Sequence, residues 1–424
     1  MSLQHKIEPG VERVASQLVQ SGFETYVVGG AVRDLLLGIP PKDYDLATAA
    51  TPEQVRQVFG RRKARIIGRR FRLAHVYTER GYYEVSTFRR EPTAEERRGR
   101  VNDDGVMLWR DNEYGTLEED ARRRDFTANA IFYDPVGNRG IIDLVGGVQD
   151  IRDGVVRTIG EPGKRLDEDP VRILRAVKLV AQYGFKAEPE LDRCLRERVE
   201  QICRASSARL FEELLKIFSR PFANRTFTVF HEYGLLRHFW PNLAEIWGTP
   251  QGWLTAALLA ERDRRMAAGG YSNSRALALS TVVFPAVATA LGCEDDPSRL
   301  WEPGEGVDAE CREAIRRFFQ PFTVSRFFTA RVRDILLLLP RFRDPTTKGR
   351  LLRHPEYKYG RELFALLATV YQWGDECLAE WPQHNPALHG SPPHRRDRRS
   401  THGRGRGHDQ GHRREPPPEA GPER

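Results

Sequence analysis

The chain has 424 residues and is 40% hydrophobic, which is enough for two or three domains with buried cores. Its N-terminus has no apolar stretch after the early basic residue, so we expect a cytoplasmic protein rather than a secreted one. The 67 Lys and Arg exceed the 59 Asp and Glu, and the basic residues are mostly arginine. That balance favours a polyanionic partner, although a GC-rich genome would also give an arginine-rich composition.

Residues 21–160, which follow an N-terminal segment of residues 1–20, are predicted to form a mixed head domain. Short β-rich runs (YVVGG, YDLAT, ARIIG, LAHVYT, YYEVSTF and NAIFYD) alternate there with helical pieces and turn residues. In the first run a strand breaks at Gly29 and Gly30 and a helix follows. Such a turn lets backbone N–H groups approach a phosphate, and Arg33 lies one turn into the helix, where it would add a formal charge.

Two carboxylates follow in KDYDLAT. If this segment is a strand, its period of two places Asp43 and Asp45 on one face, where their mutual repulsion would be relieved by Mg²⁺. Two such ions can activate a hydroxyl and stabilise a leaving pyrophosphate. A D-x-D pair is also common among exposed turn acids. Glu84, in the strand-forming segment YYEVSTF, would complete the site from a neighbouring strand, or else lie on a solvated face.

Between Arg89 and Thr116 the chain is polar and is expected to form a mobile loop. The capping-box pattern Thr116-Leu-Glu-Glu119 predicts that a helix begins there. The cluster RRRDF follows, in which Arg123 and Arg124 suit triphosphate oxygens and Asp125 suits a ribose hydroxyl or the support of metal ions.

Beyond about Glu168 the pattern becomes helical, and we divide it into a neck over residues 161–240 and a body over residues 241–385. The segment EDPVRILRA is predicted to open a helix. Asp169 and Arg172, three residues apart on one face, would offer an acceptor and a donor fork to a nucleobase.

Two further features of the helical part bear on its class. The uncharged run from Ala276 to Cys293 is interrupted by Pro285, which favours a buried pair of helices over a membrane span, so no membrane partner is expected. The five cysteines contain no C-x-x-C pair, which argues against both a zinc site and a disulfide framework.

Residues 386–424 form an Arg-, His-, Gly- and Pro-rich basic tail that contains too little apolar material to fold alone. It is predicted to be disordered. It would contact RNA or RNA-decay proteins, or remain a solvated tail without a function, and metal binding by its histidines is a weaker alternative.

The motifs GGAVRD, KDYDLAT, EVSTFR, RRDFTANAI and EDPVRILRA, taken together, resemble in order and spacing the class II nucleotidyltransferases, which comprise bacterial poly(A) polymerases and CCA-adding enzymes. The resemblance covers roughly residues 20–240. It implies an α+β fold: a polymerase-β-type head with a small mixed β-sheet, followed by all-helical neck, body and tail domains that hold RNA.

The resemblance also implies roles for individual residues. Asp43 and Asp45 match the metal-binding pair, and Glu84 fits the strand of the third catalytic carboxylate. Asp125, with Arg123 and Arg124, matches the motif that engages the ribose and phosphates and belongs to the active-site acids. The residues that match the motif reading the base are Glu168, Asp169, Arg172 and Arg175.

Within the family, the stretch from Ile66 to Val76 resembles the signature of the poly(A) polymerase branch, as does the run ARLFEELLKIFSR. No His-Asp phosphohydrolase pair occurs before the tail, where His408-Asp409 is the only such pair. The implied reaction adds AMP from ATP to RNA 3′ ends, such as those of mRNA and decay intermediates, with Mg²⁺ or Mn²⁺. Physically, however, the signature is a basic turn between two strands. CCA addition to tRNA is the alternative, and a non-catalytic RNA-binding adaptor is a third hypothesis.

Overall fold

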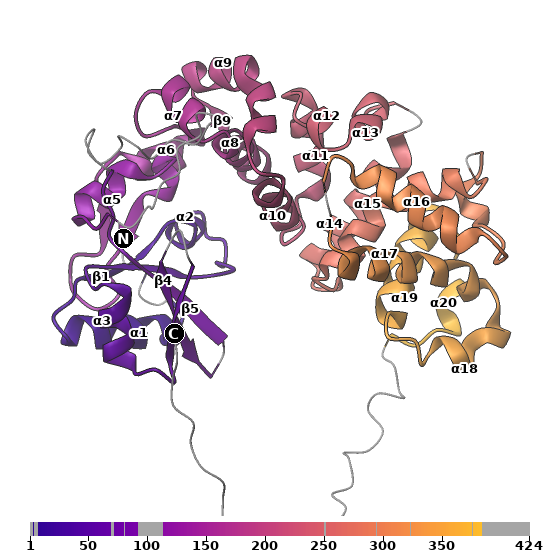
Figure 1. Ribbon diagram of the computed structural model, residues 1–424, viewed down its shortest axis with the longest axis horizontal. Coiled ribbons are helices and arrows are strands. Elements are labelled where there is room, and N and C mark those ends of the chain that lie inside the picture. Colours follow the sequence, from indigo (N-terminus) through magenta and orange to yellow (C-terminus); the bar gives the residue numbers. More distant parts are fainter. Residues whose placement is uncertain are drawn as a thin grey trace, which may run out of the picture.

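The computed structural model describes residues 3, 7–68, 72–79, 81–91, 113–249, 252–293, 295–322, 324–374 and 376–383. Three predictions therefore lie wholly or partly outside the described residues: the mobile loop, which falls mostly on 92–112, the basic turn at 69–71, and the disordered tail. The described chain follows an arch, with the head at one end and the C-terminal helices at the other (Figure 1).

The head contains a seven-stranded mixed sheet in the order β3-β4-β5-β2-β1-β6-β7. Its strands are β1 (Thr25–Val28), β2 (Asp45–Thr48), β3 (Ala64–Ile67), β4 (Leu73–Thr78), β5 (Gly81–Thr87), β6 (Ile131–Tyr133) and β7 (Ile141–Asp143). The β2–β5 pairing is parallel, and the other pairings of this sheet are antiparallel. The predicted α+β head with a small mixed sheet is confirmed.

Helices cover the two faces of this sheet unequally. On one face, α1 (Pro9–Gln20), α2 (Gly30–Leu36) and α3 (Pro52–Phe59) share a core with the sheet, which includes Val14, Leu46 and Val85. On the other face, α5 (Leu117–Arg123) packs Leu117 and Ala121 in a smaller core that also contains residues of β1, β2 and β6. The outer surfaces of β3, β4 and the first half of β5 contribute no residue to that smaller core.

The predicted start of the strand that carries Asp43 and Asp45 was wrong. β2 begins at Asp45, so Asp43 precedes the strand instead of sharing its alternation. The physical reason lies in the neighbouring strand: Val28, the last residue of β1, is the partner of Asp45, and the chain then turns at Gly29, which has φ +78°. The residue that would pair with Asp43 is Gly30, which already belongs to α2.

The neck is helical except for the short strand β9 (Lys186–Ala187), which pairs with β8 (Val155–Val156) at the end of the head. β8 follows α6 (Gly147–Asp153), and its pairing with β9 is parallel. The neck helices are α7 (Pro162–Glu168), α8 (Val171–Tyr183), α9 (Pro189–Arg198), α10 (Ser207–Ile217), α11 (Ala223–Glu232) and α12 (Leu236–Phe239). They form the top of the arch in Figure 1.

The segment EDPVRILRA opens α8 (Val171–Tyr183), as predicted, but Asp169 lies before the helix. Glu168 ends α7 and α8 begins at Val171, so Asp169 and Arg172 do not lie on one face of one helix. Asp169 is extended, with φ −145° and ψ 96°, because Pro170 disfavours the helical conformation in the residue before it.

The C-terminal body consists of helices throughout its described residues. They are α13 (Pro241–Ile246), α14 (Trp253–Ala267), α15 (Arg275–Ala290), α16 (Val307–Phe319), α17 (Arg326–Leu338), α18 (Lys348–Leu351), α19 (Tyr357–Val370) and α20 (Glu376–Ala379). The predicted pair of buried helices is the single helix α15, which continues through Pro285. An interior proline costs roughly 3 kcal/mol, and the burial of α15 among α14, α16, α17 and α19 offsets that cost.

Two further observations concern membrane spans and cysteines. Of the helices within the described ranges, none is long and apolar enough to cross a bilayer. All five cysteines are free thiols, and Cys194, Cys293 and Cys311 are buried.

Candidate functional site

The turn between β1 and α2 has the predicted backbone but a different arginine environment. Gly29 has φ +78° and ψ −133°, a conformation that strains any residue with a side chain. Arg33 is only 8% exposed, and its Nη2 donates to Oδ1 of Asp34 at 2.9 Å and to the hydroxyl of Tyr183 at 2.6 Å. Its guanidinium therefore ties the head to the neck, and its role as a phosphate ligand stays a prediction.

Asp34 lies at the centre of this head-to-neck contact, which sequence patterns did not indicate. It is 2% exposed and accepts hydrogen bonds from Arg33, Tyr183 and Arg220. Burial raises the pKa of Tyr183 to about 12, so its hydroxyl stays a donor. Tyr183 and Arg220 are 149 and 186 positions from Asp34, and no local signal could connect them.

Asp45 and Glu84 lie next to each other on the head sheet. They are register partners in the parallel β2–β5 pairing, so both carboxylates project from the same face. Neighbouring strands lie about 4.8 Å apart, which is close enough for strong coupling between the two acids. The expectation that Glu84 stands on a strand adjacent to the D-x-D pair is confirmed as geometry.

The electrostatics of Asp45 suit a cation. Asp45 is exposed at the start of β2, but the surrounding protein still desolvates its carboxylate, and this desolvation, followed by the charge of Glu84, raises its pKa to about 6, with a further contribution from Asp43 and opposition from Arg124. The Asp45 carboxylate accepts no hydrogen bond and forms no ion pair within the described part of the chain. Asp43 is 76% exposed as a side chain, with Lys42 Nζ 3.4 Å from its carboxylate.

The chemistry of these acids suits Mg²⁺. Hard divalent ions take carboxylate oxygens, and an unpaired carboxylate beside two like charges is the environment that such an ion relieves. Asp43, Asp45 and Glu84 therefore have the chemistry that Mg²⁺ binding requires. Within the described ranges, however, no group of three or more His, Cys, Asp or Glu side chains is arranged closely enough to hold a metal by itself. Water and substrate oxygens would have to complete the shell.

His75 is a residue of this face that sequence reasoning missed. It is the register partner of Glu84 across β4 and β5, and its Nε2 lies 3.4 Å from Oε1 of Glu84. The only sequence signal was the alternation in LAHVYT, which places His75 and Tyr77 on one face of the strand.

Arg123 and Arg124 lie at the C-terminal end of the capped helix α5, and the charge of Arg124 acts on Asp45. The capping box at Thr116 and Glu119 is present, as predicted. Arg124 donates to Asp120 from Nε and Nη2, at 3.0 and 2.8 Å, and its guanidinium lies 5.2 Å from the centre of the Phe132 ring. Arg123 lies 3.8 Å from the same carboxylate.

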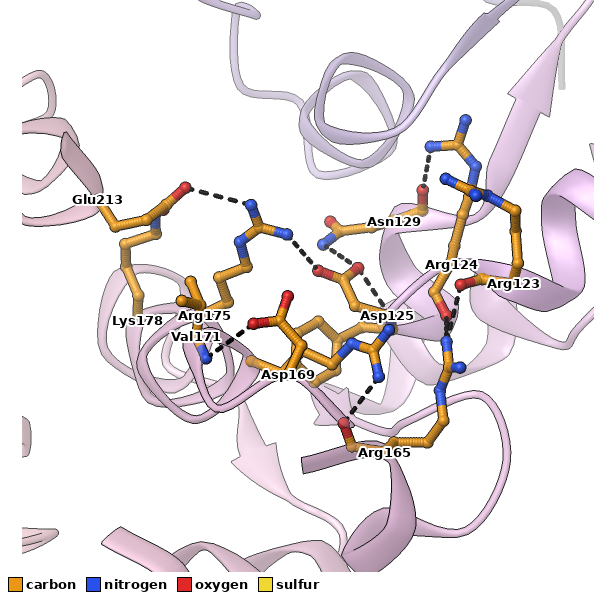
Figure 2. A network of polar contacts seen from close by, with 12 residues as sticks. Arg123, Arg124, Asp125, Asn129, Arg165, Asp169, Val171, Arg175, Lys178 and Glu213 are labelled. Carbon is orange, nitrogen blue, oxygen red and sulfur yellow. Dashed lines mark hydrogen bonds and ion pairs between the residues drawn. The ribbon is translucent and has the colours of Figure 1, made fainter. Parts of the chain in front are cut away.

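Asp125 is held from three sides. One carboxylate oxygen, Oδ1, accepts from the backbone N–H of Phe126 at 2.9 Å and from the side chain of Asn129 at 3.3 Å. The other, Oδ2, lies 3.4 Å from Nη1 of Arg175 (Figure 2). Asn129 also accepts from Arg33, so it connects Asp125 to the buried contact between head and neck.

Arg165, which the sequence did not single out, fixes the backbone of the arginine cluster. It is 7% exposed, and Nη2 donates to the carbonyl oxygens of Arg123 and Arg124 at 2.7 and 2.8 Å (Figure 2). Nη1 donates to Glu91 and Glu168. Glu168 is therefore engaged by an internal cation, and the spacing of Arg165 and Glu168, three apart on α7, was the available signal.

The predicted base-reading residues are brought together, but each already has a protein partner. Asp169 accepts from the backbone N–H of Val171 at 3.2 Å and from Arg209 at 2.9 Å. Arg172 donates from Nη1 to the carbonyl of Arg165 at 2.7 Å and to Glu168 at 3.2 Å. These contacts orient the side chains, while nucleotide binding by them stays a prediction.

Arg175 connects the site to α10. Its Nη2 lies 3.3 Å from Oε1 of Glu213 (Figure 2). Glu213 is also bound by Lys178 at 2.6 Å and by Lys216 at 2.8 Å. Burial alone would raise the pKa of Glu213, but Lys178, Arg175 and Lys216 together hold it well below its usual range. Burial lowers the pKa of Lys178, and pairing with Glu213 only partly opposes that shift.

Comparison with family models matches two parts of the chain. Residues 25–157 match a model described as the poly A polymerase head domain. Residues 184–246 match one described as a probable RNA and SrmB-binding site of polymerase A. The matched regions are the head sheet and the part of the neck that contains Glu213.

Several curated proteins are similar over most of the chain. Poly(A) polymerase I of Escherichia coli O6:H1 is 34% identical over 378 residues, which are 87% of this chain and 80% of that protein. The Haemophilus influenzae poly(A) polymerase I is 33% identical over 382 residues, or 87% and 82%. A CCA-adding enzyme of Geobacillus stearothermophilus is 38% identical over 231 residues, which are 54% of each chain.

Solved structures of two CCA-adding enzymes are similar in fold. The Bacillus stearothermophilus CCA-adding enzyme in complex with CTP has a TM-score of 0.53 and 27% identity, covering 89% of this chain and 80% of that one. The Thermotoga maritima CCA-adding enzyme complexed with tRNA has a TM-score of 0.50 and 19% identity, covering 88% and 83%. The second likeness concerns the fold alone.

Proposed function

Because the chain belongs to the class II nucleotidyltransferase family of bacterial poly(A) polymerases and CCA-adding enzymes, we propose that it is a poly(A) polymerase. In this proposal it adds AMP from ATP to RNA 3′-hydroxyls without a template and releases pyrophosphate. Its RNA partners are mRNA and decay intermediates in the cytoplasm, where its free thiols suit a reducing compartment.

The observation that carries the proposal is the pairing of Asp45 with Glu84 at the sheet face, close to a site whose other charges are already compensated. Asp43, Asp45 and Glu84 would hold Mg²⁺, and Mn²⁺ would suit the same oxygens. When bound, two such ions lower the barrier to attack by a hydroxyl and stabilise the leaving pyrophosphate.

The remaining residues position the nucleotide. Arg123 and Arg124 are assigned to the triphosphate, because guanidinium groups match phosphate oxygens and neutralise charge that develops on them. Asp125 is assigned to the ribose, where its second oxygen can accept from a hydroxyl. Arg172 and Arg175 are assigned to the base, with Asp169. Positioning and charge neutralisation supply most of the rate in phosphoryl transfer of this kind.

The choice of poly(A) addition over CCA addition is supported by how far the similarity extends. The poly(A) polymerase I relatives are similar over 87% of the chain, including its C-terminal helices, whereas the CCA-adding relative is similar over 54%. CCA addition to tRNA is the second candidate, because that relative is more similar over the part that it does cover.

The test is nucleotide incorporation into a short RNA, with ATP, CTP, GTP and UTP supplied separately and together. We expect long tails with ATP alone. A product that stops after C, C and A would instead establish the alternative, and RNA retention without pyrophosphate release would establish a binding protein. Asp43→Ala and Asp45→Ala should each abolish extension, and wild-type extension by the double variant would contradict the assigned acids.

A further inference from the structure

The outer face of β3, β4 and β5 is exposed in a way that the core does not explain. Tyr82 is 52% exposed, Ile67 40% and Tyr77 36%. Eight large hydrophobic side chains are exposed among the described residues, and these three of them share one face of the head sheet. Helix α5 covers the β1, β2 and β6 part of this sheet face, and no residue of β3, β4 or the first half of β5 joins the core that α5 forms among the described residues.

Three rings form an ordered group, which we name the aromatic platform: the exposed Tyr77 and Tyr82, and His75, whose side chain is 16% exposed. Tyr77 and Tyr82 are register partners, with ring centroids 5.8 Å apart. His75 stacks on Tyr82, with centroids 4.1 Å apart and ring planes within 18°. The guanidinium of Arg65 lies over the Tyr77 ring, 5.4 Å from its centroid, and adds a positive charge at the margin.

The aromatic platform is continuous with the acids of the proposed site. Arg65, His75, Glu84 and Asp45 are successive register partners across β3, β4, β5 and β2. Tyr82 precedes Glu84 by two residues on the same face of β5, a separation of about 7 Å along the strand. A chain of nucleotides lying on the rings would therefore end beside the carboxylates.

We propose that the aromatic platform binds the bases of the last nucleotides of the RNA primer and thereby places its 3′-hydroxyl beside Asp45 and Glu84. This inference rests on the proposed function and adds a subsite to it. The rings favour bases over phosphates as the occupant, because Glu84 and Asp45 would repel phosphate groups, whereas aromatic rings stack with any base. Such a site accepts each newly added nucleotide in turn, and Arg65 would hold the adjoining backbone.

Kinetics with a short oligo(A) primer test the inference in the full-length protein. Loss of a base–aromatic stack weakens RNA binding by about 5- to 100-fold, so Tyr82→Leu and Tyr77→Leu should each raise the KM for primer by that factor. The KM for ATP and the thermal unfolding midpoint should stay unchanged. Tyr82→Phe keeps the ring and should restore the primer KM. Phe327→Leu, which removes a ring that is 66% exposed on α17, is the matched control and should have no effect.

A binding measurement separates this inference from the proposed function. With 2-aminopurine as the 3′-terminal base of the primer, stacking on the platform should quench its fluorescence in the wild-type protein and in Tyr82→Phe, but not in Tyr82→Leu. If no nucleotide is ever incorporated, the proposed function is wrong, but the quenching still shows whether bases stack on the aromatic platform. Equal quenching by wild type and by both leucine variants, or an unchanged primer KM, would overturn the platform.

Discussion

The acids of the head sheet differ in their charge partners from the acids where the neck meets the head, here called the neck junction (Asp125, Asp169 and Glu213). At the junction, Glu213 has three cationic partners, Asp169 has Arg209, and Asp125 has Arg175. On the sheet, Asp45 has no cationic partner within ion-pair distance among the described residues, and its nearest influences include Glu84 and Asp43. Paired acids give a stable, oriented frame, whereas unpaired ones store a repulsion that a cation or a proton can relieve.

This contrast separates stability from activity. Removing Glu213 should weaken the fold, because it leaves the largely buried Lys178 without its partner. Removing a sheet acid should weaken catalysis while sparing or even favouring the fold. The predictions below follow that division from the largest expected effect to the smallest.

Asp45→Asn should have the largest effect on activity. The change keeps the size of the side chain but removes the charge that would hold a metal ion, so kcat should fall by about 10³-fold or more. Because the same change removes repulsion from Glu84, the thermal unfolding midpoint should stay the same or rise. Single-turnover extension and a melting curve measure the two quantities. Asp153→Asn, at an exposed position of α6, serves as the control, and a drop in melting temperature for Asp45→Asn alone would break the comparison.

Glu213→Gln should have the largest effect on stability. It leaves Lys178, Arg175 and Lys216 without their shared carboxylate, which should cost about 3–5 kcal/mol of unfolding free energy. Its neighbour Glu212 is exposed and lies 3.4 Å from Arg275, so Glu212→Gln should cost less than about 1 kcal/mol. Urea unfolding of both variants at pH 7 tests this difference.

The Glu213 cluster also has a pH dependence of defined sign. Its pKa is held below the unfolded value, so its stabilisation is fully present above about pH 4.5 and is lost as the pH falls from there towards the folded pKa. The stability gap between wild type and Glu213→Gln should therefore shrink in acid. A gap that stays constant from pH 7 to pH 3.5 would show that the cluster is not held by this charge.

Local patterns predicted the parts of the site that depend on neighbours in sequence. The capping box at Thr116, the break at Gly29 and the strand that carries Glu84 are all set by propensity, caps or alternation within a few residues, and the structure has them. The resemblance of the five motifs to a known family then predicted how these segments combine in one fold.

The rest depended on contacts across the arch. Arg33 could be placed one turn into α2, but not identified as the partner of Tyr183, 150 residues away. Glu213 gave no signal of its own within an ordinary amphipathic helix, and Arg165 gave only a helical spacing. The strand boundary at Asp45 was misplaced by two residues, because it is set by where β1 ends and not by the acids themselves.

Arg209→Ala should have a smaller and more selective effect. The Arg209–Asp169 pair is partly exposed, with side chains 44% and 25% accessible, so its loss should change stability by only about 1 kcal/mol or less. Asp169 would lose an orienting donor, however, and the preference for ATP over CTP should fall several-fold while the primer KM stays constant. Competition between the two nucleotides measures this ratio. Arg196→Ala, which breaks the exposed Arg196–Asp192 pair elsewhere in the neck, is the control, and equal effects of the two variants would contradict a role in base selection.

The smallest expected effect is a pH-dependent response of the folded protein to Mg²⁺. Since the pKa of Asp45 is raised to about 6 from 3.8, the cation-free folded state binds more protons than the unfolded state between these values, and stability falls as the pH rises through that window. Below about pH 6 a proton competes with the metal, so Mg²⁺ should raise the melting temperature more at pH 7.5 than at pH 5. Asp45→Asn should remove this difference and flatten the pH slope of the cation-free protein. A Mg²⁺ response that is equal at both pH values in the wild type, or unchanged in the variant, would mean that the cation stabilises the chain elsewhere and that Asp45 is not part of its site.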